Sequence, residues 1–183
     1  MVNINNEAVK YGIINGLIAL LIMYGTWAID INTFVTAQLW GMWFPYMIII
    51  LLIGGFALRK SNGGYLSFKE ALKFTFLSYV IAGVIVAVGT YVLYNIIDPE
   101  LTKRSFEAGV EKMRGMMEKF GTPDDKIDEQ IEKSREQAKE TGIKNILLGF
   151  GLGLIWDFVK SLLISLIIRK EKPAFQEDFT QPQ

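Results

Sequence analysis

Residues 74–97 read FTFLSYVIAGVIVAVGTYVLYNII, and none of these side chains carries a charge. The hydrocarbon core of a bilayer is about 30 Å thick, so an α-helix needs roughly 20 mostly apolar residues to cross it. The block is long enough to do so, and it stands between the charged residues Lys73 and Asp98. We therefore predict that it forms a membrane-spanning helix.

Three further apolar blocks lie on either side of this one, at residues 11–29, 34–58 and 145–168. Each is long enough to cross a bilayer. The chain is therefore expected to be an all-α integral membrane bundle of four transmembrane helices, three within residues 1–97 and the fourth within 145–170. A cleavable signal peptide is the alternative for the first block, but its apolar stretch is long for a signal and no small-residue cleavage site follows.

Local signals mark the ends of these helices. Ser67 and Glu70 have the spacing of a capping box, in which each side chain accepts a hydrogen bond from a free backbone N–H group at a helix start. Asp98 precedes Pro99, and a residue in that position disfavours the α conformation, so the third span should stop there. In the second block, Pro45 lacks a backbone donor and is expected to kink the helix.

Residues 98–144 are different in kind, since they carry ten Lys or Arg and twelve Asp or Glu, a net charge of −2. Such a segment cannot lie in lipid. Its apolar residues still recur at helical spacing, and Gly121 followed by Thr122-Pro123 ends one helix and starts another. We predict an extramembrane helical hairpin. Its facing apolar stripes would consist of Phe106, Val110, Met113, Met117, Phe120, Ile127 and Ile131.

A helix pair lying flat on the membrane is the competing interpretation of this segment. The mixed signs of charge on its polar face argue against it, because surface-bound helices are typically basic on that face. The tail, residues 171–183, is polar, contains two prolines and has no helical period. We expect it to be disordered.

The basic residues predict an orientation. Four spans place both termini and the loop at residues 59–73 on one side, which carries basic pairs at the ends of the second and fourth spans. The short loop on the other side, residues 30–33, has no Lys or Arg. The positive-inside rule then places the termini in the cytoplasm. The ten basic residues of 98–144 point the other way, but the basic pairs lie directly at the interface.

Asp157 and Lys160 lie inside the fourth apolar block, where each charge costs about 2.5–3.5 kcal/mol on insertion scales. At a spacing of three residues they share a helix face and can pair. We expect the pair to point into the bundle. Three roles remain open: a self-contained pair that neutralises itself, a contact with a partner's transmembrane helix, or an ion or proton site.

Small residues on three of the spans predict close approach between helices. The packing positions are Gly12 and Gly16 on the first span, Gly83 and Ala87 on the third, and Gly149 and Gly153 on the fourth. Polar residues within the spans, among them Asn15, Ser78 and Ser161, are expected to form hydrogen bonds between helices.

Composition excludes several kinds of chemistry. The chain has no Cys, so disulfides and thiolate metal sites are impossible. It has no His, which removes the commonest general base and metal ligand. The formal net charge is zero, so nothing indicates nucleic acid as a partner. We find no pattern for a catalytic site, a metal site or a cofactor, and we expect a protein that is not an enzyme.

Two stretches resemble a known family. Residues 64–71, GYLSFKEA, lead into the third span, and residues 94–99, YNIIDP, close it. With four spans and a charged helical insertion after the Asp-Pro, the chain over about residues 6–172 resembles domain-of-unknown-function family 4199, a group of small bacterial membrane proteins. The resemblance implies the fold and a bacterial inner-membrane location, with residues 98–144 periplasmic. It brings no catalytic residues, and the intramembrane charged pair is not among the family's features.

These observations favour an accessory or structural subunit that binds other membrane proteins or itself within the lipid bilayer, with the hairpin as its docking element. The alternative is a small transporter or channel subunit that uses Asp157. Transporters are often built from internal repeats, and the sequence shows none.

Overall fold

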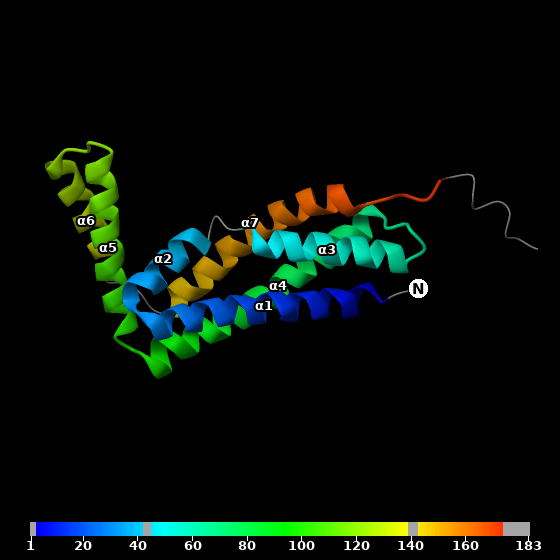
Figure 1. Cartoon of the computed structure of the whole chain (residues 1–183), viewed down its shortest axis with the longest axis horizontal. Coiled ribbons are helices and arrows are strands. Elements are labelled where there is room, and N and C mark those ends of the chain that lie inside the picture. The colour runs from blue at the N-terminus through cyan, green and yellow to red at the C-terminus, as the bar shows by residue number, and fades with distance from the viewer. Residues whose placement is uncertain (1–2, 42–44, 139–142, 174–183) are drawn as a thin grey trace, which may run out of the picture. The chain divides into compact units, whose positions relative to one another are not determined.

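The computed structural model describes residues 3–41, 45–138 and 143–173. Within these ranges every regular element is helical, with seven α-helices and one π-helical turn (Figure 1). The elements are α1 (Ile4–Ile29), α2 (Ile31–Gly41), α3 (Tyr46–Ser61), α4 (Phe68–Val92), η1 (Leu93–Ile97), α5 (Leu101–Lys119), α6 (Asp124–Ala138) and α7 (Ile143–Ile168). The all-α prediction is confirmed. The predicted disordered tail lies, beyond residue 173, outside the described residues.

Three of these helical stretches are long and apolar enough to cross a membrane: α1, α4 continued through η1, and α7 from Leu148 onward. A fourth span is possible if α2 and α3 form one broken helix. At most 28% of the residues in any of the three apolar windows are buried inside the molecule, and Leu21 and Leu152 are 73% and 68% exposed. Lipid suits such an apolar exterior and water does not. The helices are therefore compatible with a membrane protein.

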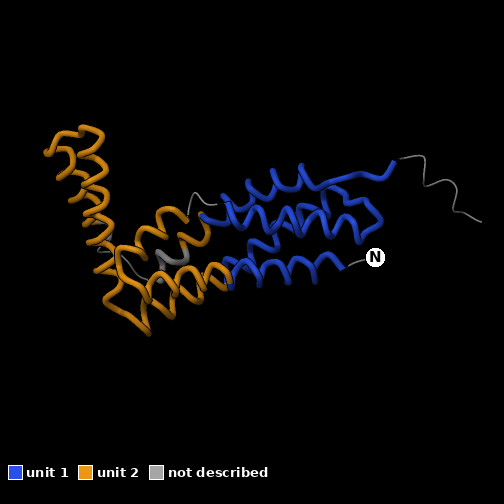
Figure 2. Tube along the Cα trace, in the orientation of Figure 1, with its two compact units in different colours: residues 1–17, 45–84, 153–183 blue, residues 18–44, 85–152 orange. Residues whose placement is uncertain are grey.

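Contacts divide the chain into two compact units, which are drawn in different colours in Figure 2. Unit 1 contains residues 1–17, 45–84 and 153–183, and unit 2 contains residues 18–44 and 85–152. Because the division falls within α1, α4 and α7, each of these helices contributes to both units. Each unit is described separately below.

In unit 1, α1 and α4 run in the same direction and pack closely. The hydroxyl of Ser78 donates to the carbonyl of Ala8 at 3.0 Å. One turn further along α1, a Cβ added at Gly12 would lie only 2.8 Å from the Ser78 carbonyl oxygen and 2.8 Å from Cβ of Ile81. Gly12 thus allows the two backbones to approach, and Gly16 beyond it is also buried.

The other small-residue positions behave differently. Gly83 and Ala87 on α4 are only partly buried. At Gly149 and Gly153 on α7, an added Cβ would meet no atom within 4 Å among the described residues, and both glycines are exposed. The expected close approach at these two glycines is therefore not found among the described residues.

The capping box predicted at the start of α4 is present. Oε2 of Glu70 accepts from the backbone N–H and the hydroxyl of Ser67 at 2.9 and 2.8 Å, and the hydroxyl of Ser67 accepts from the Glu70 N–H at 3.3 Å. This is a complete capping box.

Around Pro45 the single helix expected over residues 34–58 is instead two helices. Helix α3 begins at the residue after the proline, whose missing N–H disrupts a continuous helix.

In unit 2, α5 packs against α2. Leu101 and Ala108 of α5 are buried in one cluster with Phe34 and Val35 of α2, and the Lys112 ammonium donates to the Thr36 hydroxyl. Sequence periodicity missed this face of α5. Ala108 is too small to stand out in a hydrophobic pattern, and its partners lie far away in the chain.

The next helix, α6, contacts the other side of α5. Arg114 of α5 forms an ion pair with Asp128 of α6, and Ile127 and Ile131 are buried. Phe120 is an exception to the predicted stripes, since it is 84% exposed. It occupies the C-cap position after α5, where the helical repeat no longer directs a side chain toward α6. The other four stripe positions on α5 are partly buried; they are Phe106, Val110, Met113 and Met117.

Candidate functional site

The charged pair of α7 is the first candidate site. Nζ of Lys160 lies 2.5 Å from Oδ1 of Asp157, and the two side chains are 27% and 20% exposed. The same ammonium lies 4.7 Å from the ring centroid of Tyr79 on α4, which is a cation–π distance. Lys160 is therefore held by a carboxylate on its own helix and by an aromatic face on a neighbouring one.

The direction of the pair follows from the two faces of α7. The side that packs in unit 1 carries Ser161, Ile164 and Ser165, all at most 1% exposed. Asp157 lies one turn before Ser161 on that side. The opposite side carries large exposed apolar residues such as Trp156 and Leu163, as a lipid-facing surface would. The ion pair consequently lies at the edge of the packed face.

A row of hydroxyl groups continues from Asp157 along α7 to α4. The hydroxyl of Ser161 donates to the Asp157 carbonyl at 2.7 Å, and that of Ser165 donates to the Ser161 carbonyl at 2.6 Å. The hydroxyls of Ser165 and Thr75 are 3.0 Å apart and share a hydrogen bond. An unpaired hydroxyl in an apolar interior costs free energy. The hydrogen bonds of these three side chains avoid that cost, and the bond between Ser165 and Thr75 joins α7 to α4.

Two other polar side chains in unit 1 are buried without this compensation. Among the described residues, the hydroxyl of Tyr79 and both polar atoms of the Asn15 amide have no hydrogen-bond partner. We expected Asn15 to bond between helices; the structure instead buries it completely, with no hydrogen-bond partner in the part of the chain that is described. The sequence analysis did not identify Tyr79 as a site residue.

A signal for this site existed in the sequence. Thr75, Ser78 and Tyr79 recur at the spacing of one helix face, and all three are at most 1% exposed. Polar residues repeating at that spacing inside an apolar span indicate an inward-facing polar stripe. Chemically, the site holds one balanced ion pair and neutral hydroxyl and amide groups. Among the described residues no cluster of three or more Asp, Glu, His or Cys could hold a metal ion.

The end of α5 and the start of α6 form the second candidate site. Phe120 and, one turn earlier, Met116 are exposed, the latter by 53%. Charged residues are frequent on both helices: Arg114 pairs with Asp128, which raises the pKa of the guanidinium, and Lys133 bonds to Glu129 at 2.7 Å, which lowers the pKa of that carboxyl. Met116 and Phe120 thus expose two large apolar side chains, four residues apart, on an otherwise polar helix pair.

The base of α5 is firmly attached to α1. Oδ2 of Asp98 accepts from the indole N–H of Trp27 at 2.9 Å and also pairs with Arg104 on the first turns of α5. The hydroxyl of Tyr24 donates to the Gly89 carbonyl at 2.9 Å. Asp98 follows the π-helical turn and joins three segments of unit 2. Neither Trp27 nor Arg104 was a predicted site residue.

The two stretches that resembled a family both have structural roles here, Ser67 and Glu70 as a helix cap and Asp98 as a junction. No curated protein and no solved structure matched the chain. A family model matches residues 10–170, which is most of the sequence and agrees with the resemblance. The chain therefore belongs to the family described as "Protein of unknown function (DUF4199)".

Proposed function

We propose that this protein is a non-enzymatic accessory subunit of the bacterial inner membrane, which binds the extramembrane part of another membrane protein through the α5–α6 turn. The observation that carries the proposal is the 84% exposure of Phe120 on a helix pair that is otherwise highly charged. Binding energy at protein interfaces concentrates in a few residues, and aromatic side chains are prominent among them.

The proposed arrangement in the membrane has four spans: α1, the broken helix α2–α3, α4 with η1, and α7. It places α5 and α6 outside the lipid on the periplasmic side and both termini in the cytoplasm. The polar composition of α5–α6 supports its place outside the lipid. The basic residues around the α3–α4 loop and after α7 support the cytoplasmic side for the termini.

Attachment at the base makes α5–α6 suitable for docking. Asp98 is bonded to Trp27 and Arg104, and Lys112 is bonded to Thr36. A docking element fixed in this way loses little conformational freedom when a partner binds. Because the element stays near the membrane surface, the partner it meets most often is another membrane protein. Lipid is a poor occupant for Phe120, since Lys119, Asp124 and Asp125 would have to enter the membrane surface with it.

The intramembrane ion pair fits a structural role in this proposal. The charge of Asp157 is matched by Lys160, and Lys160 is also in contact with Tyr79. Both charged groups are engaged in these contacts, so neither is available for proton transfer to a substrate. The pair orients α7 against α4, and the docking element provides the partner specificity.

Site-specific photo-crosslinking tests the proposal. A benzoylphenylalanine placed at position 120 in living cells should crosslink to one membrane protein, which is then tagged and used to capture the wild-type chain in mild detergent. Phe120→Ser should abolish this capture. Lys119→Ser, an exposed change at the neighbouring position, is the matched control and should retain it. Crosslinking to lipid alone, or equal capture of both variants, would refute the docking role.

A transporter or channel subunit is the second candidate. The Tyr79 hydroxyl and the Asn15 amide favour it, since both are buried without a hydrogen-bond partner within the described residues. Polar groups inside a span often mark ion or substrate pathways. Proteoliposomes with a pH gradient test it: the wild type should dissipate the gradient and Asp157→Asn should not. Equal leakage from the two variants would exclude Asp157 as a carrier.

A further inference from the structure

The end of unit 1 formed by the α3–α4 loop and the segment after α7 is strongly basic. Residues 59–73 and 169–172 contain seven Lys or Arg and two Glu, a net charge of +5. All seven cations except the half-buried Arg59 are exposed. None of the seven makes an ion pair with an acidic side chain among the described residues. The seven are Arg59, Lys60, Lys69, Lys73, Arg169, Lys170 and Lys172.

This basic end is well ordered by short-range contacts. Leu66 and Lys170 exchange two backbone hydrogen bonds, of 2.9 and 2.7 Å, which join the loop to the segment after α7. Arg59 donates to the carbonyl of Ile168 at 3.2 Å, which ties α3 to the end of α7. Gly63 and Gly64 have φ values of 73° and 86°, a left-handed conformation that glycine adopts without strain. The loop is therefore held in one shape.

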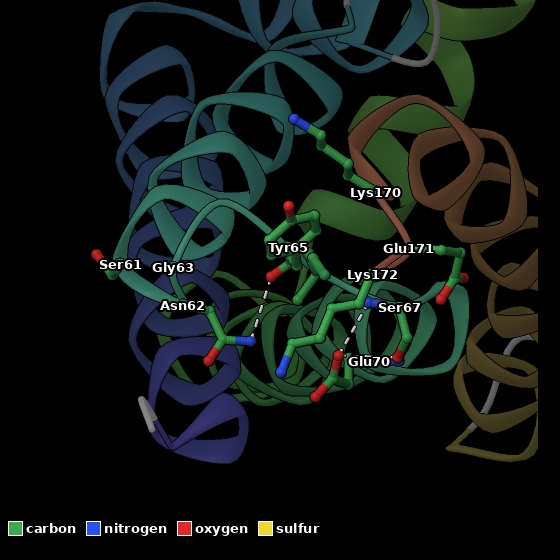
Figure 3. A pocket seen from close by; sticks show the side chains of 10 residues that line it. Ser61, Asn62, Gly63, Tyr65, Ser67, Glu70, Lys170, Glu171 and Lys172 are labelled. Atoms are coloured by element: carbon green, nitrogen blue, oxygen red, sulfur yellow. Dashed lines mark hydrogen bonds between the residues drawn. The ribbon is translucent and has the colours of Figure 1, made fainter. Parts of the chain in front are cut away.

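A pocket of about 350 Å³ opens within this basic end. Ser61, Asn62 and Ser67 line it on the loop side, and Lys170 and Lys172 line it from the C-terminal segment (Figure 3). In that view the Lys172 side chain extends toward the part of the pocket where Asn62 lies, and the Asn62 amide donates to the Tyr65 carbonyl at 3.2 Å. The Lys170 ammonium points the other way in the same view and lies 5.6 Å from the ring centroid of Tyr65. The Lys172 ammonium and the hydroxyl and amide groups therefore line the opening, and Lys170 adds positive charge beside it.

The two carboxylates in the pocket wall already have partners. Glu70 accepts from the backbone and hydroxyl of Ser67, and Glu171 accepts from the Phe68 N–H at 3.0 Å. Both therefore serve the free N–H groups and positive dipole at the start of α4. The lysines are not neutralised by them, since no ion pair joins either carboxylate to Lys170 or Lys172 among the described residues.

We propose that this pocket binds the phosphate of an anionic phospholipid from the cytoplasmic leaflet; this inference rests on the membrane location given under the proposed function. Ammonium groups bind phosphate as point charges. Basic pockets between transmembrane helices at the cytoplasmic face are suited to acidic headgroups. The exposed ring of Phe56, with the Arg59 guanidinium 5.0 Å from its centroid, provides an apolar surface beside the charges for the acyl chains.

The test uses the full-length protein purified in dodecyl maltoside, with phosphatidylglycerol as the probe and native mass spectrometry to count bound lipid. We expect saturable binding of phosphatidylglycerol and not of phosphatidylcholine. Each lysine near an anionic surface contributes about 1 kcal/mol, or about fivefold in affinity. The double variant K170A/K172A should therefore bind about 25-fold more weakly, and K170R/K172R, which keeps both charges, should recover most of the affinity.

The matched control is K103A/K119A, which removes two exposed positive charges from α5 and should bind like the wild type. Equal binding of the two lipids, or equal losses in the two double-alanine variants, would overturn the proposal. Displacement of the lipid by millimolar sodium phosphate would also overturn it, in favour of a site for free phosphate. Carbonate extraction of cell membranes separates the two levels: release of the protein refutes the membrane location itself, whereas a retained protein without lipid selectivity refutes only the lipid site.

Discussion

Replacing the members of the Asp157–Lys160 pair one at a time and together tests whether the pair is a structural unit. With the charges 2.5 Å apart and an effective dielectric constant of about 20, Coulomb's law gives an attraction of about 7 kcal/mol. Inserting each charge into the centre of a membrane helix costs about 3 kcal/mol. Attraction and insertion cost therefore nearly cancel for the intact pair, which leaves about 1 kcal/mol of net stabilisation.

Removing one charge disturbs this balance. Asp157→Asn or Lys160→Met loses the attraction of about 7 kcal/mol and recovers only the insertion cost of the removed group, so each should destabilise by about 4 kcal/mol. The double variant loses the attraction but recovers both insertion costs, and should be destabilised by only about 1 kcal/mol. This is the pattern known for buried ion pairs, in which leaving one charge unpaired is worse than replacing both.

The assay is reversible unfolding in mixed micelles of dodecyl maltoside and sodium dodecyl sulfate, followed by circular dichroism and analysed as a double-mutant cycle. The two single losses should far exceed the loss of the double variant. If the single losses are small and simply add, Asp157 and Lys160 do not depend on each other. The charges would then be compensated from outside the chain, and the transporter or partner-helix roles would gain support.

Two further predictions concern single positions. Gly12→Ala would place a Cβ against the α4 backbone, whereas the Cβ of Gly25→Ala would meet no atom within 4 Å among the described residues. Both changes gain about 1 kcal/mol of helix propensity, so the close contact alone should make the unfolding free energy of the first variant about 1–3 kcal/mol lower than that of the second. Equal values would show that α1 and α4 are not closely packed there. Thr33 donates to both oxygens of Asp30, which lowers the pKa of that carboxyl, so the stabilisation of the α2 start is present above the ordinary pKa and is lost as the pH falls through the lowered one. Thr33→Val should move the Asp30 pKa upward in a carboxyl NMR titration, and an unchanged midpoint would contradict the assignment.

The long apolar helices and the helix cap could be predicted because the information is local. A charge-free block long enough for a bilayer identifies α4 without any knowledge of its neighbours. The capping box at Ser67 and Glu70 involves side chains three residues apart and forms as the spacing indicates. The break between α2 and α3 was also anticipated, at Pro45, although a kinked helix was expected and two helices were found.

The packing of α5 could not be predicted in the same way. The periodicity of its large apolar residues indicates one face, toward α6, and that reading fails at Phe120, where the helix ends. The face toward α2 is made by the small Ala108 and by Lys112, whose partner Thr36 lies in a different apolar block. Hydrophobic patterns do not register an alanine or an amphipathic lysine as a contact residue, so only the tertiary structure reveals this interface.

In the candidate site, too, some residues could be identified from the sequence and others could not. Asp157 and Lys160 are conspicuous because charges are costly inside an apolar block. Tyr79 is not, since a tyrosine in a span reads equally well as packing or as an interfacial anchor. Its importance arises only in the folded chain, where an ammonium lies 4.7 Å from its ring and its own hydroxyl is buried with no partner that the described residues supply.

The two stretches that resemble the family have structural roles in this chain. The first caps α4 and holds the basic loop through Leu66, and the second ends in Asp98, which joins α1 to the base of α5. Both stretches fix helix ends, and neither includes Asp157, Lys160 or Tyr79. The two stretches therefore account for helix ends in this chain, and a binding role has to be sought in other residues.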